Sequence, residues 1–219
     1  MQFDAAIFDL DGTLADTLED LADATNRLLI AEGLPAHDYA WYRLAIGNGV
    51  RQLITTAIPT ENRSEETITG YVGRMMADYD DHCLVHTRLY DGIAETLAGL
   101  RAAAVRLAVN SNKPDGPTRR IVDALISPGT FEAVMGARPD VPLKPDPSAA
   151  LLISEGMGVS PSRMAYVGDS RVDMLTAAAA GMTAIGVSWG FRSKAELIEN
   201  GAVVVLDRPR DLLGLRAVP

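Results

Sequence analysis

Short apolar segments alternate with helical stretches along most of this chain of 219 residues, and this alternation restricts its fold more than any other feature. Such a pattern predicts strands joined by helical crossovers, which build a parallel sheet with helices on its faces. The segments predicted as strands are Phe3–Phe8, Val105–Asn110, Ala133–Gly136, Met164–Gly168, Thr183–Val187 and Ala202–Leu206. The sequence therefore predicts an α/β fold with a parallel sheet.

The alternation breaks once, between Asp16 and His86, where helical periodicity continues without a convincing strand. Leu18, Leu21 and Leu28 form the first apolar stripe of this region, and Gly47-Asn48-Gly49 interrupts the second predicted helix. We therefore expect a helical insertion over residues 16–86. Residues 1–15 and 87–219 then form the α/β core.

Charge and cysteine content exclude several kinds of partner and location. The formal net charge is −9 and the pI is near 4.8, so nucleic acid and anionic membranes would be repelled. Cys83 is the only cysteine, which rules out an internal disulfide and favours a reducing compartment. The sequence shows neither a signal-peptide pattern nor an apolar run long enough to cross a bilayer. A cytoplasmic protein is the expectation.

The strongest chemical signal follows the first predicted strand, in Asp9-Leu10-Asp11-Gly12-Thr13. Open α/β sheets place their sites at the carboxyl ends of parallel strands. Two carboxylates at positions i and i+2 of an extended segment point the same way, and the glycine lets the chain turn sharply. A plain Asp-Gly turn is the alternative, but Asp9, Thr13 and Asp16 together favour function.

Three later segments end in residues suited to the same site. Ser111-Asn112-Lys113 offers a hydroxyl and backbone N–H groups for phosphate, although alone it is only a polar loop. Lys144 lies in a proline-rich stretch that can hold its ammonium group in place. Asp169 and Asp173 end another strand, where they can join Asp9 in binding a hard divalent cation.

These motifs, in this order, resemble the haloacid dehalogenase superfamily and its phosphoglycolate phosphatase-like branch. The resemblance spans almost the whole chain, and the helical insertion matches the position of that branch's cap. It implies a Rossmann-like core with an inserted helical cap. It also implies a Mg²⁺-dependent phosphatase that hydrolyses a small phosphorylated metabolite, with phosphoglycolate as the leading substrate, in a monomer or homodimer.

The resemblance assigns a role to each motif position. Asp9 is the expected nucleophile, which forms an aspartyl-phosphate, and Asp11 is the expected general acid and base. Lys144 neutralises charge on Asp9 and on the phosphate. The remaining positions complete the expected site: Ser111, Asn112, Lys113 and Gly12 at the phosphate; Asp9, the Asp11 carbonyl and Asp169 at Mg²⁺; Asp173 and Thr13 in support.

Two points are left open by the sequence. Arg51 follows the Gly47-Asn48-Gly49 loop and is a candidate contact for the far end of the substrate, with a solvated helix arginine as the alternative. A phosphosugar mutase and a pyrophosphatase share the expected chemistry, and a catalytically idle binding protein is the rival from another class. The intact Asp9, Asp11, Lys144 and Asp169 argue against the idle protein.

Overall fold

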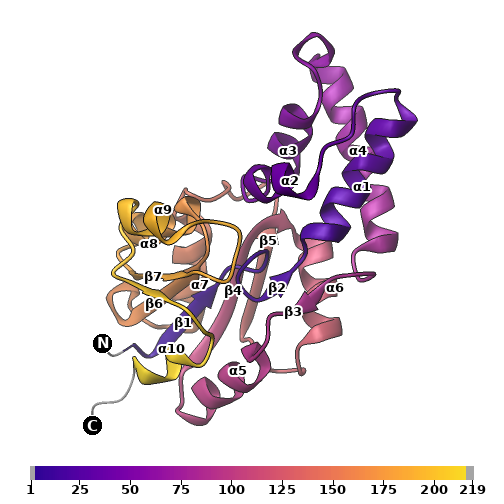
Figure 1. Cartoon of the computed structure of the whole chain (residues 1–219). Helices are drawn as coiled ribbons and strands as arrows, with labels where there is room; N and C mark the ends of the chain where they lie inside the picture. The colour runs from indigo at the N-terminus through magenta and orange to yellow at the C-terminus, as the bar shows by residue number, and fades with distance from the viewer. Residues whose placement is uncertain (1–2, 216–219) are drawn as a thin grey trace.

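The computed structural model describes residues 3–215 and contains a parallel sheet of six strands (Figure 1). The strands lie in the order β5-β4-β1-β6-β7-β8. They are β1 (Ala5–Phe8), β4 (Arg106–Pro114), β5 (Ala133–Ala137), β6 (Met164–Gly168), β7 (Thr183–Val187) and β8 (Val204–Leu206). The six predicted strands are all present. The main difference is β4, which runs on to Pro114 where the prediction ends at Asn110, so its polar motif lies in extended backbone.

The central strand shows why the sheet carries helices on both faces. All four residues of β1 are buried, and their side chains alternate between the two faces. Ala6 and Phe8 pack into one hydrophobic cluster, whereas Ala5 and Ile7 pack into a second one on the opposite face. A strand buried on both sides reads as a continuous apolar run, as this one does. The fold is therefore a three-layer α/β sandwich.

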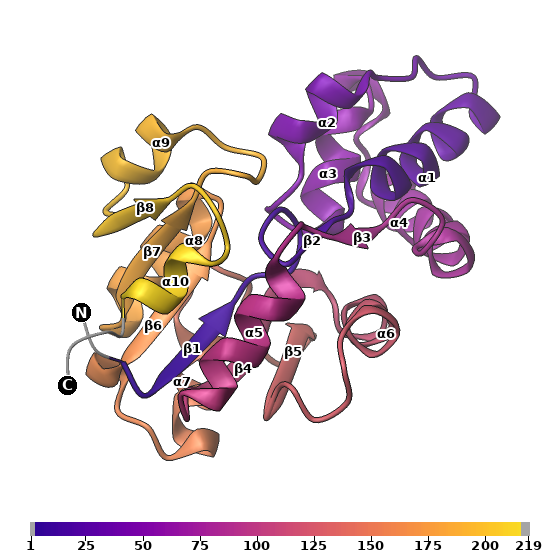
Figure 2. The same cartoon turned by 60° about the horizontal axis from the view of Figure 1, so that its bottom comes forward.

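Six helices flank the sheet (Figure 2). The first cluster includes side chains of three of them, which are α5 (Ile93–Ala102), α6 (Asp115–Leu125) and α10 (Asp211–Gly214). The second cluster includes side chains of the other three, which are α7 (Ser148–Met157), α8 (Arg171–Ala180) and α9 (Lys194–Glu199). Gly181 ends α8 in the left-handed conformation with φ 71°, as its place after the alanine run predicts.

Four further helices lie apart from the sheet, at the end where its strands finish (Figure 1). We call them the cap. They are α1 (Leu18–Ala31), α2 (Tyr39–Ala45), α3 (Val50–Ala57) and α4 (Glu65–His82). The glycine-containing segment separates α2 from α3 because Gly47 and Gly49 adopt φ values of 120° and 84°. Among residues 3–215, no helix is both long and apolar enough to cross a membrane.

The two chain crossings between core and cap lie side by side. Two short strands, β2 (Ala15–Asp16) and β3 (Arg88–Leu89), pair antiparallel there. Neither strand was among those predicted, because a two-residue strand is too short to produce the alternation that would reveal it. Both crossings are thus tied to each other by backbone hydrogen bonds.

Asp20 reinforces this junction from inside α1. Its carboxylate is 2% exposed and accepts hydrogen bonds from the backbone N–H of His86 (2.9 Å) and of Thr87 (2.9 Å). The Thr87 hydroxyl donates a third, at 2.7 Å. A buried carboxylate is costly unless it is satisfied in this way, and the donors in turn depend on it.

We expect Asp20→Ala to destabilise the protein, because it leaves the buried N–H and hydroxyl of Thr87 and the partly buried N–H of His86 without their acceptor. The free energy of unfolding should fall by at least about 1.5–3 kcal/mol, measured by urea denaturation at unchanged m-value. Asp23→Ala is the matched control, since Asp23 lies in the same helix and accepts only from the exposed hydroxyl of Tyr39. Equal midpoint shifts in the two variants would contradict the role given to Asp20.

Candidate active site

The predicted motif residues converge at the carboxyl edge of the sheet. Asp9 follows β1, Ser111 lies in β4, and Asp169 follows β6, so three adjacent strands supply them. The loop after β5 brings Lys144 to the same point. The chain runs from β1 to β4 and β5 on one side and then crosses to β6, β7 and β8 on the other side of β1, and such a switch point is where open α/β folds form their binding crevices.

Lys144 lies between two of the carboxylates. Its Nζ is 3.0 Å from Oδ1 of Asp9 and 2.7 Å from Oδ1 of Asp173, and it also donates to the Asn110 carbonyl at 3.1 Å. The lysine is 5% exposed. Burial lowers the pKa of Lys144, but the attraction of Asp173 and Asp9 outweighs it and raises the pKa well above its usual value. The side chain is therefore a fixed positive charge.

For Asp9 and Asp169, unlike Lys144, burial outweighs the attraction of nearby charges and disfavours the charged form. Burial raises the pKa of Asp9 to about 7, against the influence of Lys144 and with the help of Asp173 and Asp11. The pKa of Asp169 is raised well above its usual value, first by burial and then by the charges of Asp173 and Asp9. Both carboxylates would be stabilised in their charged forms by another cation.

A hard divalent cation fits this cluster. Carboxylate oxygens of Asp9, Asp169 and Asp173 lie within 4.8 Å of one another. Asp173 is the weakest ligand candidate, since its Oδ1 is taken by Lys144 and its Oδ2 by the Ser170 backbone N–H and hydroxyl. Asp169 is a stronger candidate, because the only described donor to its Oδ1 is the Thr13 hydroxyl, at 3.3 Å. Buried oxygen donors of this kind suit Mg²⁺.

The segment from Trp189 to Phe191, which was not among the predicted site residues, holds Asp169 in place. The Phe191 N–H donates to Oδ2 of Asp169 at 2.7 Å, and the indole N–H of Trp189 donates to the Thr13 carbonyl at 3.0 Å. Thr13 itself donates to Oδ1 of Asp169 at 3.3 Å. The signal in the sequence is Trp189-Gly190-Phe191 directly after β7, at the same edge of the sheet as the other motifs.

Two glycines make room for this arrangement. Gly12 has φ 80°, and a Cβ on it would lie 2.3 Å from Oδ2 of Asp169. A Cβ on Gly190 would lie 2.2 Å from the Gly12 carbonyl oxygen and 2.4 Å from Cβ of Asp169. Neither position can accept a side chain unless Asp169 or the backbone moves. Gly12 therefore packs against the carboxylate cluster.

Asp11 is held by one of its two oxygens. Oδ1 accepts from the Thr17 hydroxyl at 2.7 Å and pairs with Nζ of Lys113 at 3.1 Å. Lys113 is buried and also donates to the hydroxyl of Tyr79, on the cap helix α4, at 2.9 Å. The position of the second motif carboxylate is thereby linked to the cap. Sequence reasoning predicted Lys113 near the phosphate but had no signal for Tyr79.

Ser111 and Asn112 lie beside Asp9 in the extended end of β4. The Ser111 hydroxyl accepts from the Lys113 backbone N–H at 3.2 Å, which leaves its proton available to another acceptor. The Asn112 side chain holds both backbone atoms of Lys144, accepting from its N–H at 2.8 Å and donating to its carbonyl at 3.0 Å. A further hydrogen bond, to the carbonyl of Gly47 at 3.1 Å, reaches the cap.

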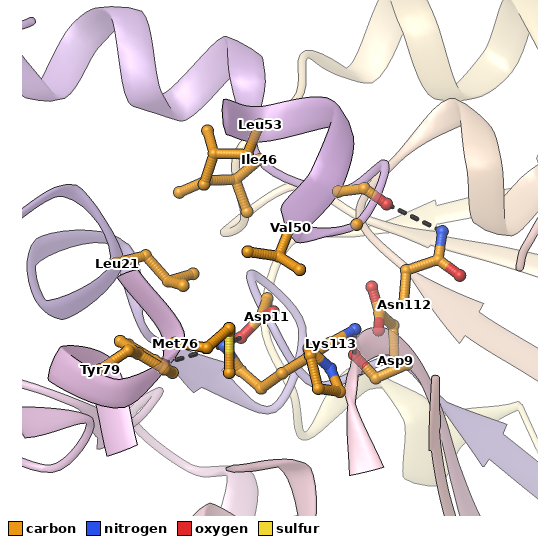
Figure 3. Close-up of a pocket in the computed structure, with 14 residues that line it drawn as sticks. Asp9, Asp11, Leu21, Ile46, Val50, Leu53, Met76, Tyr79, Asn112 and Lys113 are labelled. Carbon is orange, nitrogen blue, oxygen red and sulfur yellow. Dashed lines mark hydrogen bonds and ion pairs between the residues drawn. The ribbon is translucent and has the colours of Figure 1, made fainter. Parts of the chain in front are cut away.

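These residues form the floor of a pocket whose roof is the cap (Figure 3). The floor consists of Asp9, Asp11, Ser111, Asn112, Lys113 and Pro114. The cap contributes an almost wholly apolar wall, which consists of Leu21, Ile46, Gly47, Gly49, Val50, Leu53, Met76 and Tyr79. Gly47 and Gly49 of the loop between α2 and α3 are part of this wall. Charged groups thus meet a ligand at one end of the pocket and apolar groups at the other.

The structure does not bring Arg51 to this pocket. Val50 and Leu53, three residues apart on α3, line it, whereas Arg51 points to a different side of the helix. There its guanidinium pairs with Glu65 at 2.5 Å and contacts the Thr69 hydroxyl at 3.4 Å, with half of the side chain exposed. The geometry therefore agrees with the alternative reading, a solvated helix arginine.

Comparison with known proteins agrees with this fold. A family model described as haloacid dehalogenase-like hydrolase matches residues 6–187. Phosphoglycolate phosphatase 1 of Pseudomonas aeruginosa is 34% identical over 212 residues, covering 94% of this chain and 77% of that protein. The phosphoglycolate phosphatase of Rhodospirillum rubrum is 32% identical, with 93% and 86% covered.

Solved structures agree as well. A Lactobacillus delbrueckii subsp. bulgaricus protein, provisionally assigned as a phosphoglycolate phosphatase, superposes with a TM-score of 0.92 at 31% identity, and each chain is covered to 99%. The parallel sheet carries buried carboxylates and a buried lysine at its carboxyl edge, an arrangement suited to a hydrolase that acts on phosphate esters. The chain belongs to the haloacid dehalogenase-like hydrolases, and within them it is a phosphatase.

We expect Gly190→Ala to impair catalysis by displacing Asp169 or the Gly12 backbone. Turnover of p-nitrophenyl phosphate should fall by about 100-fold, the usual effect of a displacement near 1 Å at an active site. Gly156→Ala is the control, because a Cβ there meets nothing within 4 Å and the residue lies in α7. Wild-type turnover in Gly190→Ala would show that Asp169 tolerates the displacement.

Proposed function

We propose that this phosphatase hydrolyses a small phosphomonoester through an aspartyl-phosphate on Asp9, with Mg²⁺ as its cofactor. The observation that carries the proposal is the state of Asp9 at the floor of the pocket. Its Oδ1 is held by the Leu10 N–H at 2.7 Å and by Lys144 at 3.0 Å. Its Oδ2 accepts no hydrogen bond from a described residue, so this oxygen is free to attack phosphorus.

The charges around Asp9 meet the main electrostatic requirement of this reaction. Two anions about 4 Å apart repel each other by about 4 kcal/mol at an effective dielectric constant near 20. Lys144 offsets part of this repulsion, since it is buried, charged and already in contact with the nucleophile. Ser111 and the backbone N–H of Asn112 would bind the phosphoryl oxygens.

Asp11 is suited to move the proton. It lines the pocket two residues after the nucleophile, and Thr17 and Lys113 hold its Oδ1. The other oxygen would give a proton to the departing alkoxide and later take one from the water that hydrolyses the aspartyl-phosphate. A halide leaves without a proton, so a carboxylate at this position favours phosphate esters over haloacids as substrates.

Asp9, Asp169 and the backbone carbonyl of Asp11 would hold the cofactor. When bound, Mg²⁺ supplies positive charge that offsets the nucleophile and the phosphate. Asp173 would support the site indirectly, because it pairs with Lys144 and forms the capping box at the start of α8.

Phosphoglycolate is the first substrate that we propose, because the P. aeruginosa and R. rubrum relatives carry that name. A third relative, the N-acetylmuramic acid 6-phosphate phosphatase of P. aeruginosa, is 31% identical, with 97% of this chain and 94% of that protein covered. It makes a larger phosphoester the second candidate. The acidic protein would act in the cytoplasm, as a monomer or homodimer.

The proposal predicts release of inorganic phosphate from phosphoglycolate with Mg²⁺ alone, without a sugar bisphosphate. N-acetylmuramic acid 6-phosphate and pyrophosphate, assayed in parallel, rank the substrate classes by kcat/KM. Activity should disappear in excess chelator and return when Mg²⁺ is added. Retention of full activity in chelator would refute the role of the cation. A strict requirement for a sugar bisphosphate would indicate a mutase instead.

Asp9→Asn tests the nucleophile. The amide cannot attack phosphorus and binds a cation more weakly, so turnover should be abolished, with a loss of at least about 10⁴-fold. The variant should fold, because the change is isosteric and removes one of several crowded buried carboxylates. Wild-type protein quenched in acid during turnover should carry phosphate on Asp9, detectable by mass spectrometry. Activity of Asp9→Asn within tenfold of wild type would rule out the aspartyl-phosphate.

A further inference from the structure

The segment from Trp189 to Arg192, which follows β7, contacts the cap as well as the catalytic core. Two of its residues contact the core: Trp189 donates to the Thr13 carbonyl, and Phe191 donates to Asp169. Arg192 turns the other way, and its side chain is only 10% exposed although it lies in a loop. The reaction proposed above makes no use of this buried guanidinium.

Arg192 donates to the carbonyl end of the cap helix α2. Its Nη2 bonds the carbonyls of Leu44 at 2.9 Å and Ile46 at 2.8 Å, and its Nη1 bonds that of Arg43. The last carbonyls of a helix lack partners within the helix and carry partial negative charge. In the other direction, Nη1 of Arg43 in the cap donates to the Gly190 carbonyl at 3.0 Å. Two arginines therefore cross the boundary in opposite directions.

The carbonyls that Arg192 binds lead directly into the pocket wall. Ile46 and Gly47 line the pocket, and a Cβ on Gly47 would lie 4.0 Å from Nη2 of Arg192. From the other side, Asn112 of the phosphate-binding strand donates to the Gly47 carbonyl. The wall formed by Ile46 and Gly47 is thus held between Arg192 and Asn112.

We propose that Arg192 is a positioning residue, which holds the Ile46–Gly47 wall over the phosphate site and so sets affinity for the organic part of the substrate. The proposal rests on the proposed function. The phosphate itself should be little affected, because Ser111 and Lys144 belong to the core. Asn112 keeps two hydrogen bonds to the Lys144 backbone without the cap.

The test compares an organic ligand with bare phosphate at the same site. In Arg192→Ala, KM for p-nitrophenyl phosphate should rise by about tenfold while kcat stays within about twofold. Ki for inorganic phosphate should remain near the wild-type value. Arg192→Lys, which keeps one charged donor group, should give an intermediate KM. Arg74→Ala is the matched control, because Arg74 pairs with Glu32 entirely within the cap.

A spectroscopic readout makes the test independent of turnover. The chain has two tryptophans, so Trp41→Phe leaves Trp189, beside Arg192, as the sole reporter. In that background Arg192→Ala should shift the emission of Trp189 to the red, because the segment that carries the indole loses its hydrogen bonds to the end of α2. Arg74→Ala should not. If the wild type hydrolyses neither p-nitrophenyl phosphate nor any of the phosphoesters named above, the proposed function fails while this measurement still stands.

The outcomes separate cleanly. A selective rise in KM with a red shift supports the proposal. Unchanged KM and emission would overturn it, and so would an equal rise in KM and in Ki for phosphate, which would mean that Arg192 supports the whole site.

Discussion

Lys144 places a single positive charge among carboxylates that the fold has removed from water. Three of them, Asp9, Asp169 and Asp173, lie together in the core, and the lysine contacts two. Burying an ion costs several kcal/mol even after the structure relaxes, and one lysine offsets only part of the charge of three carboxylates. Much of the surrounding structure holds these groups in place. Asn112 fixes the backbone of Lys144, and the capping box of α8 fixes Asp173.

The parallel sheet makes this cluster from residues that are far apart in the sequence. Every strand of the sheet ends at the same edge, and each neighbouring end contributes one kind of group. The strand β1 supplies the carboxylates at positions 9 and 11, β4 supplies hydroxyl and amide groups, and β6 supplies Asp169. The charged and polar groups of the pocket thus come mostly from the core, whereas most of its apolar lining comes from the cap.

Much of this could be predicted from the sequence, for a physical reason. Buried parallel strands are continuous apolar runs, and the polar residues that follow them must lie at one edge, so β1, β6, Lys144 and Asp169 could all be predicted. Contacts between cap and core left no such pattern. Tyr79 reads as one more apolar helix position, and only tertiary packing places its hydroxyl on Lys113. The pairing of Arg51 with Glu65 could not be predicted either, since helical periodicity does not indicate which neighbour each face of a helix meets.

The pairing of β2 with β3 has a consequence for how such a chain can change over generations. Because the chain leaves the core and returns to it at neighbouring points, the segment between Asp16 and Arg88 can be replaced without shifting any strand of the six-stranded sheet. Adjacent ends of this kind are where insertions are tolerated best. Selection can therefore exchange the helices that select a ligand while the residues that perform the reaction stay fixed, so one catalytic centre can give rise to enzymes with many different substrates.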